Sequence, residues 1–350
     1  MRVLHVDSGR EYRGGQDQVR LLARELARAP AVDQRLVTRR DSELARRATA
    51  EGVAVRGVPW GPGLDPRAWG RLVVESLRWP PDLIHAHNSH AVTLAVWARR
   101  FLQYAGAAPR IVATRRVVFP LRVGSALRRV DAVIAISRAV KTGLVAAGIV
   151  PGEITVVADG VDPAAIRAAA ATPLGIRARL ALTDGTPLAA NIAALEPSKD
   201  QATLVRAARA ARARCPDLHW VIAGAGPGRS ALEHEIRRLD LADRVHLLGY
   251  VEQADALIQE SDVLVMSSKE EGLGSVVLHA LALAKPVVAT AGGGLPEIVP
   301  AEWLVPVGDH EALARKVVQA LEHPVPVPLP PQCTASAMAA AVLAVYRSLV

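Results

Sequence analysis

The sequence predicts an α/β protein built from two doubly wound parallel sheets. Short apolar segments alternate with amphipathic segments along almost all of the 350 residues, which is the pattern of repeated βαβ units. The alternation stops at the turn cluster Ala158-Asp159-Gly160-Val161-Asp162-Pro163 and then starts again. The length also suits two domains that each bury a core of their own.

The first half of the chain contains seven expected strands. They lie at 2–7, 34–38, 53–58, 82–86, 110–114, 131–136 and 154–157. The helices expected between them lie at 15–29, 41–50, 66–78, 89–104 and 138–147. The first of these helices carries Val19, Leu22, Ala23 and Leu26 at helical spacing, so one of its faces is apolar.

The second half repeats the pattern. Strands are expected at 187–193, 218–223, 244–248, 262–266, 286–290 and 303–306, and helices at 199–214, 229–240, 252–259, 275–284 and 309–322. Five prolines between Pro324 and Pro331 predict an extended strap, and an alanine-rich helix is expected at about 334–349. The predicted domains are therefore 1–163 and 164–323, followed by a strap and tail helix over 324–350.

The composition argues for a protein of the cytoplasm. Hydrophobic residues make up 51% of the chain, yet no apolar run reaches the length of about 18 residues that a membrane span needs. The first residues predict a strand and lack the features of a signal peptide. Cys215 and Cys333 lie far apart in the sequence, which fits a reducing compartment better than a disulfide framework.

The positive charge is concentrated in the first half. Residues 1–163 hold 25 Lys and Arg against 15 Asp and Glu, a formal charge of +10, whereas the rest holds 17 against 19, a charge of −2. This imbalance indicates an anionic partner, such as a membrane surface or a nucleic acid, or else ordinary solvated faces. Apolar residues surround five of these arginines, namely Arg115, Arg116, Arg122, Arg128 and Arg129. Such interleaving suits a membrane surface, and the aromatic content of 3% argues against nucleic acid.

The most informative motif runs from Glu270 to Ala280. A strand at 263–266 leads into a loop with two glycines, and a helix opens at about Ser275. Glycines let a ligand approach the backbone, and the first turn of a helix presents free N–H groups and a positive dipole end. The backbone of Gly272, Leu273, Gly274 and Ser275 is therefore expected to bind phosphate or sugar oxygens at the carboxyl end of a parallel strand. Gly14 and Gly15 open the first helix in the same way.

Several motifs occur in an order that resembles a known family. They are Gly14-Gly15, His85-Ala86-His87-Asn88-Ser89-His90, Ile136-Ser137, Asp159-Gly160-Val161-Asp162, Lys199, Gly224-Ala225-Gly226-Pro227, Gly249-Tyr250-Val251 and the stretch from Glu271 to Ala280. In this order the chain resembles a retaining glycosyltransferase of the GT-B fold, in the family 4 group. The resemblance implies two doubly wound Rossmann-like domains facing across a cleft. It also implies a tail helix that crosses back to the first domain.

The resemblance assigns donor-binding roles in the second domain. Glu271 would contact the donor sugar, and Lys199 would neutralise the diphosphate. His279 stands where the family has a second acid that holds the ribose, and Ala194 stands where it usually has an arginine. The remaining residues implied at the donor site are Gly14, Gly15, Gly224, Gly226, Tyr250, Val251, Gly272, Leu273, Gly274 and Ser275.

The resemblance also implies an acceptor side in the first domain, formed by His87, Asn88, His90 and Arg116. Arg115 occupies the position at which many family members have a histidine close to the reacting sugar carbon. An arginine stays protonated and cannot act as a base. In enzymes of this kind the leaving phosphate itself is thought to take the acceptor proton, while the protein supplies position and charge stabilisation.

These observations predict a metal-independent enzyme without a cofactor. The sequence has no Asp-x-Asp motif, and the histidines at 85, 87 and 90 lack a carboxylate or cysteine to complete a zinc set. The expected activity is sugar transfer from a nucleoside diphosphate sugar to a cell-surface glycan or lipid-linked acceptor of the lipopolysaccharide or capsule type. It would take place at the inner face of the cytoplasmic membrane, with no nucleic acid partner. A nucleotide-sugar 2-epimerase and a non-catalytic nucleotide-sugar-binding homologue are the alternatives.

Overall fold

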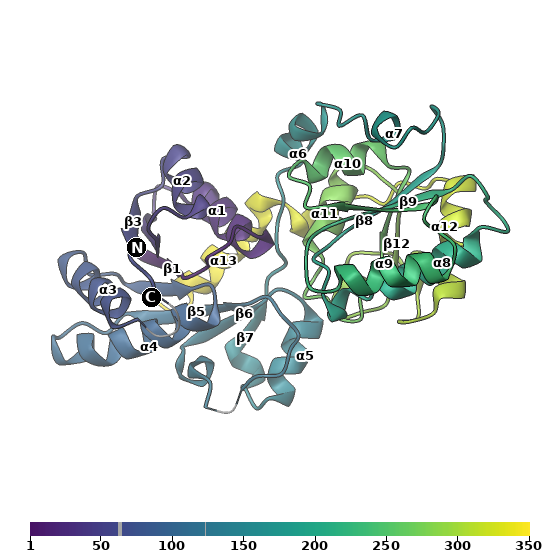
Figure 1. Cartoon of the computed structure of the whole chain (residues 1–350). Helices are drawn as coiled ribbons and strands as arrows, with labels where there is room; N and C mark the ends of the chain where they lie inside the picture. The colour runs from purple at the N-terminus through teal and green to yellow at the C-terminus, as the bar shows by residue number, and fades with distance from the viewer. Residues whose placement is uncertain (62–64, 123) are drawn as a thin grey trace. The chain divides into compact units, whose positions relative to one another are not determined.

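The computed structural model describes residues 1–61, 65–122 and 124–350, and it divides the chain into two compact units (Figure 1). The first unit comprises Met1–Gly160 together with Gln332–Val350, and the second comprises Val161–Pro331. The proline-rich segment expected to form a strap thus belongs to the second unit up to Pro331. No helix in the described part of the chain is both long and apolar enough to cross a bilayer.

The first unit contains a parallel sheet of seven strands in the order β3-β2-β1-β4-β5-β6-β7. Their bounds are β1 (Arg2–Asp7), β2 (Asp33–Arg39), β3 (Val55–Val58), β4 (Leu83–Ala86), β5 (Arg110–Arg115), β6 (Ala132–Ala135) and β7 (Ile154–Val156). Val6 of β1 is paired with Val37 on one side and with Ala86 on the other. The order reverses between β1 and β4, so this is the switch point where an open α/β sheet binds ligands.

The described residues of this unit form six α-helices. They are α1 (Gly14–Leu26), α2 (Glu43–Ala50), α3 (Pro66–Arg78), α4 (Ser89–Tyr104), α5 (Arg138–Ala146) and α13 (Ala335–Arg347), with the 3-10 helices η1 (Ala126–Arg129), η2 (Pro151–Glu153) and η6 (Pro331–Cys333). The side chains of Ser42, Asp65, Asn88 and Ser137 each accept a hydrogen bond from the first turn of the helix that follows. Such caps satisfy N–H groups that the helix itself leaves unpaired.

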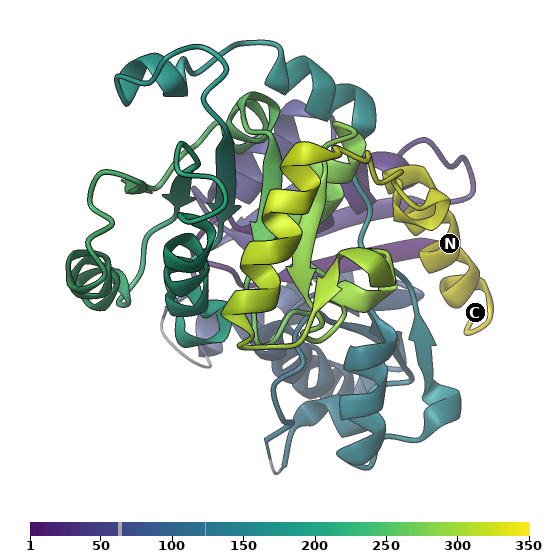
Figure 2. The same cartoon turned by 90° about the vertical axis from the view of Figure 1, so that its right-hand side faces the viewer.

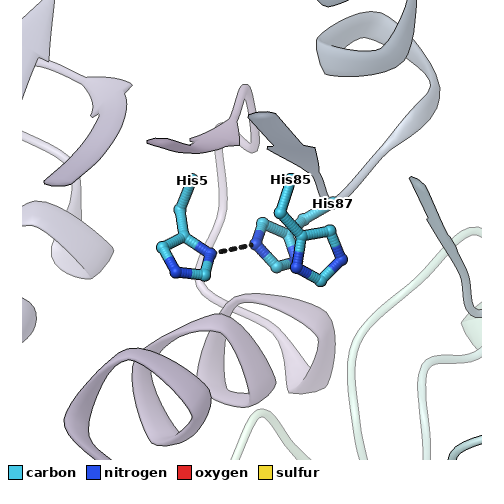
Figure 3. A group of neighbouring side chains, drawn as sticks. All are labelled: His5, His85 and His87. Atoms are coloured by element: carbon cyan, nitrogen blue, oxygen red, sulfur yellow. Dashed lines mark hydrogen bonds between the residues drawn. The ribbon is translucent and has the colours of Figure 1, made fainter. Parts of the chain in front are cut away.

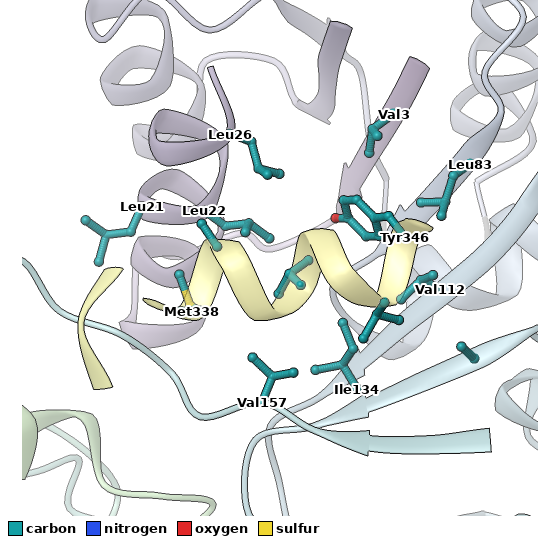
Figure 4. Packing of buried hydrophobic residues seen from close by; sticks show 14 of the residues in the cluster. Val3, Leu21, Leu22, Leu26, Leu83, Val112, Ile134, Val157, Met338 and Tyr346 are labelled. Atoms are coloured by element: carbon teal, nitrogen blue, oxygen red, sulfur yellow. The ribbon is translucent and has the colours of Figure 1, made fainter. Parts of the chain in front are cut away.

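The tail helix α13 is part of the core of the first unit (Figure 4). Its residues Met338, Val342 and Tyr346 pack against Leu22 of α1 and against apolar side chains of the sheet. The start of α13 also explains a glycine of the turn cluster. A Cβ at Gly160 would lie 2.5 Å from the carbonyl oxygen of Thr334, so only glycine allows this close approach.

The second unit contains a parallel sheet of six strands in the order β10-β9-β8-β11-β12-β13. Their bounds are β8 (Leu188–Ile192), β9 (His219–Ala223), β10 (Val245–Gly249), β11 (Val263–Met266), β12 (Val287–Thr290) and β13 (Leu304–Val305). Each strand overlaps a strand expected from the sequence. The switch point of this sheet lies between β8 and β11.

The helices of the second unit cover both faces of its sheet. They are α6 (Pro163–Ala170), α7 (Ile176–Arg179), α8 (Gln201–Ala211), α9 (Arg229–Arg238), α10 (Ala254–Glu260), α11 (Ser275–Ala282) and α12 (His310–Glu322), with η3 (Pro197–Lys199), η4 (Leu295–Glu297) and η5 (Ala301–Trp303). The short helices α6 and α7 were not expected. Helix α12 lies beside α8 and packs against β11 and β12 (Figure 2).

Candidate active site

The switch point of the second unit brings together the two charged residues predicted for the donor site. Lys199 ends η3, which follows β8, and Glu271 lies in the loop that follows β11. The Lys199 Nζ and Glu271 Oε1 atoms are 2.6 Å apart. The two residues are 72 positions apart in sequence, and they meet because β8 and β11 are neighbours whose carboxyl ends share one edge of the sheet.

Hydrogen bonds between the two loops fix this ion pair. Ser268 Oγ donates to Glu271 Oε1 over 2.9 Å, and Ser267 Oγ donates to the carbonyl oxygen of Lys199 over 2.9 Å. The backbone N–H of Lys269 donates to the carbonyl oxygen of Ser198. Glu271 is only 9% exposed. Its Oε2 atom accepts no hydrogen bond from the residues that the structure describes, so one oxygen remains for a ligand hydroxyl.

A glycine-rich loop after β12 supports the loop that carries Glu271. The N–H of Gly294 donates to the carbonyl oxygen of Glu271 over 2.9 Å. A Cβ at Gly293 would lie 2.1 Å from that same carbonyl oxygen, and a Cβ at Gly292 would lie 2.3 Å from the carbonyl oxygen of Ser268. Sequence reasoning missed this loop, although three successive glycines after a strand were the available signal.

The N-terminus of α11 lies next to Glu271 along the chain. Its cap, Gly274, has a φ of 98°, a left-handed conformation that favours glycine, and a Cβ there would lie 2.8 Å from Leu295 Cδ2. No side chain of the described residues caps the helix, so the N–H groups of Ser275 and Val276 are available to a bound anion. Leu273 is buried, while Gly272 and Ser275 are partly exposed.

His279 forms a hydrogen bond that the sequence does not predict. Its Nδ1 atom lies 2.6 Å from Oδ1 of Asp255, which belongs to the first turn of α10. Both side chains are partly exposed. A carboxylate is therefore present beside the position at which the resembled family has its second acid.

The other residues expected at the donor site have a structural explanation of their own. A Cβ at Gly224 would lie 1.8 Å from the carbonyl oxygen of Ala193, and a Cβ at Gly226 would lie 2.5 Å from that of Leu195. These glycines let the loop after β9 pack on the segment that leads to Lys199. Tyr250 is exposed and Val251 is partly exposed directly after β10.

The switch point of the first unit holds a second polar group. Asn88 Nδ2 donates to Asp7 Oδ2 over 2.9 Å, and Ser8 Oγ donates to Asn88 Oδ1 over 2.6 Å. Gln16, in the first turn of α1, approaches the other oxygen of Asp7 at 3.4 Å. Of these residues, Asn88 was predicted as a site residue. Asp7 was missed because its sequence context shows only the end of an apolar strand.

Arg116 lies beside the first turn of α1. Its Cδ atom would be 3.8 Å from a Cβ built on Gly15, and its Nε atom is 3.3 Å from Oδ1 of Asp159. Burial raises the pKa of Asp159, and the guanidinium of Arg116 opposes that rise. Gly14 is exposed and Gly15 partly exposed, so a helix N-terminus and a guanidinium are adjacent in this unit.

Arg115 is engaged with its own loop. Its guanidinium donates to the carbonyl oxygens of Val117 and Phe119, and burial lowers its pKa. It also lines a small, shallow hollow, together with Asn88, Ser89 and Thr114. His90 is exposed in the first turn of α4, close along the chain to this hollow.

His87 does not lie at the surface, contrary to the acceptor-side role expected for it. It is buried in a cluster with His5 and His85, formed by β1 and the end of β4 (Figure 3). His5 Nδ1 and His87 Nε2 are 3.0 Å apart, and the two ring nitrogens of His85 contact Tyr346 and Thr114. Burial lowers the pKa of all three histidines. Because both ring nitrogens of His85 already have partners, neither can bind a metal unless these bonds rearrange.

Two doubly wound units, each with polar residues and a glycine-opened helix at its switch point, define a protein of the GT-B fold. Comparisons with known families agree. Residues 175–337 match the model for glycosyl transferases group 1, and residues 13–160 match a glycosyl transferase 4-like domain. The chain therefore belongs to the group 1 glycosyltransferases of the GT-B fold.

Individual relatives match different shares of the chain. A GDP-mannose-dependent monoacylated alpha-(1-6)-phosphatidylinositol monomannoside mannosyltransferase of Corynebacterium glutamicum is 35% identical over 162 residues, which cover 43% of this chain and 42% of that enzyme. A 2-deoxystreptamine glucosyltransferase of Streptomyces kanamyceticus is 28% identical over 278 residues, covering 71% and 70%. The fold is similar to that of Alr3699/HepE from Anabaena, solved with UDP-glucose. The TM-score is 0.77, the identity is 20%, and the match covers 100% of this chain and 98% of that one.

Proposed function

We propose that this protein transfers a sugar from a nucleoside diphosphate sugar to a cell-surface glycan or lipid-linked acceptor, with retention of anomeric configuration. The observation that carries the proposal is the ion pair between Lys199 and Glu271 at the switch point of the second unit. It places a cation and a hydrogen-bond acceptor beside the uncapped N-terminus of α11. A diphosphate joined to a sugar needs this combination of groups.

Lys199 and the first turn of α11 bind the donor diphosphate in this proposal. An ammonium group has three donors, and Glu271 uses one of them, so two remain for phosphate oxygens. The N–H groups of Ser275 and Val276 supply further donors. Glu271 offers its Oε2 atom to a hydroxyl of the donor sugar. A nucleoside diphosphate sugar is therefore a substrate in this scheme, and no cofactor takes part.

The acceptor binds to the first unit, around Asn88, His90 and Arg116. Partial support for a lipid-linked acceptor comes from the Corynebacterium relative, whose name specifies a phosphatidylinositol mannoside substrate. The net charge of +10 in residues 1–163 also suits an anionic acceptor or an anionic membrane surface. We accordingly infer that the reaction takes place at the cytoplasmic face of a membrane.

The transfer breaks the bond between the sugar C1 atom and the diphosphate oxygen, and it forms a bond from C1 to the acceptor oxygen on the same face. The acceptor proton moves to the departing diphosphate. This scheme needs no protein base near C1, which accords with an arginine, Arg115, at the position where many members of the resembled family have a histidine, since arginine stays protonated. Lys199 and the helix N-terminus stabilise the negative charge that develops on the leaving group, and no divalent ion is required.

Glu271→Gln tests the proposal, with Glu270→Gln as its matched control. Glu270 is the neighbouring acid and is exposed. Nucleotide sugars are first screened by thermal stabilisation, because a ligand that binds the native state raises the melting temperature. The best donor is then incubated with membrane-derived acceptors. Wild type and Glu270→Gln should transfer sugar, and Glu271→Gln should lose transfer while it still binds the nucleotide.

Other outcomes would contradict the proposal. Interconversion of two nucleotide sugars without any acceptor would indicate an epimerase. Stabilisation by a nucleotide sugar without transfer to any acceptor and without slow hydrolysis would indicate a non-catalytic binding protein. An inverted anomeric configuration in the product would contradict the retaining mechanism but would still support sugar transfer.

A further inference from the structure

Helix α4 exposes an aromatic stripe that the proposed transfer does not use. Trp97, Phe101 and Tyr104 are 46%, 45% and 94% exposed, respectively. Their spacing of four and three residues puts them on one side of the helix. The chain has only 6 Trp, 4 Tyr and 2 Phe, so this stripe holds a large share of its aromatic side chains. Exposed apolar side chains gathered in one place mark a binding surface more often than scattered ones do.

Helix α3 extends the stripe into a wider surface. Val74 and Leu77 are exposed on α3, one helical turn apart. The rings of Trp69 on α3 and Phe101 on α4 are in edge contact, with centroids 5.7 Å apart, and the two helices lie side by side in the first unit (Figure 1). We call the exposed side chains of Val74, Leu77, Trp97, Phe101 and Tyr104 the α3–α4 face.

Positive charge surrounds the α3–α4 face. Arg71 and Arg78 of α3 and Arg100 of α4 are exposed, and they form no ion pair with any residue in the described ranges 1–61, 65–122 and 124–350. No acid occurs in α4, and the one acid of α3, Glu75, is bonded to Arg35. Helices α3 and α4 therefore carry three unpaired arginines and no unpaired acid beside these apolar side chains.

We propose that the α3–α4 face docks the first unit on an anionic lipid surface. Aromatic rings are stable at the boundary between lipid headgroups and hydrocarbon, and arginines next to them attract anionic headgroups. Two copies of this face would instead bring like charges together, which opposes self-association. The proposal builds on the membrane-associated function proposed above by assigning that association to one surface.

Three of the five interleaved arginines are engaged within the first unit. Arg115, Arg116 and Arg128 are bonded to groups of the protein itself, and Leu127 is buried. Arg122 and Arg129 are exposed. All three arginines of the α3–α4 face, by contrast, are exposed and have no ion-pair partner among the described residues.

Docking through α4 also suits a lipid-linked acceptor. His90, which is exposed and predicted to face the acceptor, lies seven residues before Trp97 on α4, and this spacing of two turns puts the two residues on the same side of the helix. At 1.5 Å per residue the two positions are about 10 Å apart along the axis. A lipid surface bound at the aromatic stripe would therefore lie close to His90.

Vesicle sedimentation tests the proposal without donor or acceptor. Wild-type protein should bind vesicles of phosphatidylglycerol and phosphatidylcholine and should bind pure phosphatidylcholine much more weakly. The triple variant Trp97→Ser, Phe101→Ser, Tyr104→Ser should bind the anionic vesicles at least tenfold more weakly. The triple variant Arg71→Gln, Arg78→Gln, Arg100→Gln should lose about a hundredfold, because each basic residue near an anionic surface contributes about 1 kcal/mol.

A matched control removes three positive charges from a different surface. Arg209, Arg214 and Arg237 are exposed in the second unit, and their triple Gln variant should bind vesicles like wild type. Equal binding by wild type and both α3–α4 variants would overturn the proposal. So would a face-dependent dimer, or binding of single-stranded oligonucleotides that the aromatic variant loses while vesicle binding persists.

The outcome is independent of catalysis. The two arginine variants should keep the wild-type melting temperature, since their changed side chains are exposed. The aromatic variant loses the contact between Phe101 and Trp69, so it is assayed well below its own melting temperature. All three variants should also keep the wild-type rate with a short, water-soluble acceptor. If no transfer is found for any protein but vesicle binding depends on the α3–α4 face, the docking surface stands and the proposed reaction fails.

Discussion

The imidazole of His279 on α11 and the carboxylate of Asp255 on α10 are joined by a hydrogen bond of 2.6 Å between Nδ1 and Oδ1. When Nδ1–H donates to a carboxylate, the Nε2 atom is left as an acceptor. A hydroxyl group can then donate to Nε2. The pair thus offers one acceptor, backed by a negative charge, at the position where related enzymes would use a carboxylate on α11 directly.

We expect Asp255→Ala and His279→Ala to weaken binding of the nucleoside part of the donor by a similar factor of about ten, the loss of one hydrogen bond near a charged group. Because each residue acts through the other, the double variant should be little worse than either single variant. Isothermal titration calorimetry with the nucleoside diphosphate that stabilises the protein most would measure this cycle. Asp217→Ala, an exposed acid of the second unit, is the control. Strictly additive losses would show that the two residues act separately.

Lys199→Ala should weaken binding of the nucleoside diphosphate about a hundredfold and leave nucleoside binding within about threefold of wild type. The reason is that the phosphates are the only part of the donor that the ammonium group contacts in this scheme, and a charged hydrogen bond contributes about 1.5–3 kcal/mol. Titration calorimetry of both ligands measures the difference. Lys269→Ala is the matched control, since Lys269 is an exposed lysine of the facing loop, 3.5 Å from Asp200. An equal loss of affinity for the nucleoside diphosphate and for the nucleoside would show that Lys199 does not bind the diphosphate.

The proposed mechanism also predicts that transfer persists when divalent ions are removed. Lys199 and the N–H groups of α11 carry the stabilisation of the leaving group, so no metal ion has to do so. The initial rate should stay within about twofold of the untreated rate after dialysis against EDTA and assay in EDTA. Activity that disappears with EDTA and returns with Mg²⁺ or Mn²⁺ would contradict this part of the scheme.

Much of the fold could be predicted because the local sequence is enough to identify most of the strands. Segments such as Val263–Met266 are short, wholly apolar and flanked by turns. This pattern is typical of a strand that is buried on both faces of a sheet. The two short helices after Asp162 could not be recognised in the same way. Helix α7 has only four residues, too few for a helical period to show.

Residues of the candidate site could be predicted only where they belong to a recognisable sequence motif. Lys199 and Glu271 stand in recognisable loops, but their ion pair depends on β8 and β11 being neighbours, which local sequence does not specify. Asp255 was missed because α10 is far from His279 in sequence. His87 was misplaced because its partner, His5, comes from a strand 82 residues earlier.

Tyr346→Phe should destabilise the first unit by about 1–3 kcal/mol. The change removes the hydroxyl that bonds His85 Nδ1 over 2.6 Å and leaves a buried ring nitrogen without a partner. Urea unfolding followed by a probe in the first unit measures the loss. Tyr104→Phe, at an exposed tyrosine, should have no effect. A Tyr346→Phe protein as stable as wild type would mean that this bond contributes little to the docking of α13.

Acidification should destabilise the first unit through the buried histidines. Burial lowers the pKa of His5 from 6.5 to about 4, and it lowers the pKa values of His85 and His87 well below 6.5. Between pH 6.5 and 4 the unfolded chain therefore binds protons that the folded unit excludes. The free energy of unfolding is fully retained above pH 6.5 and falls by about 1.4 kcal/mol per pH unit for each histidine as the pH drops below it.

Removing one of these histidines should reduce that slope. Between pH 6 and 4.5, the His5→Asn protein should take up about one proton fewer on unfolding than wild type does. Its free energy of unfolding should therefore fall less steeply as the pH drops, by about 1.4 kcal/mol per pH unit. His234→Asn, at an exposed histidine of α9, should leave the slope unchanged. Denaturant unfolding at a series of pH values measures both. If His5→Asn kept the full wild-type slope, the acid sensitivity would come from groups other than His5, even though burial lowers the pKa of His5 to about 4.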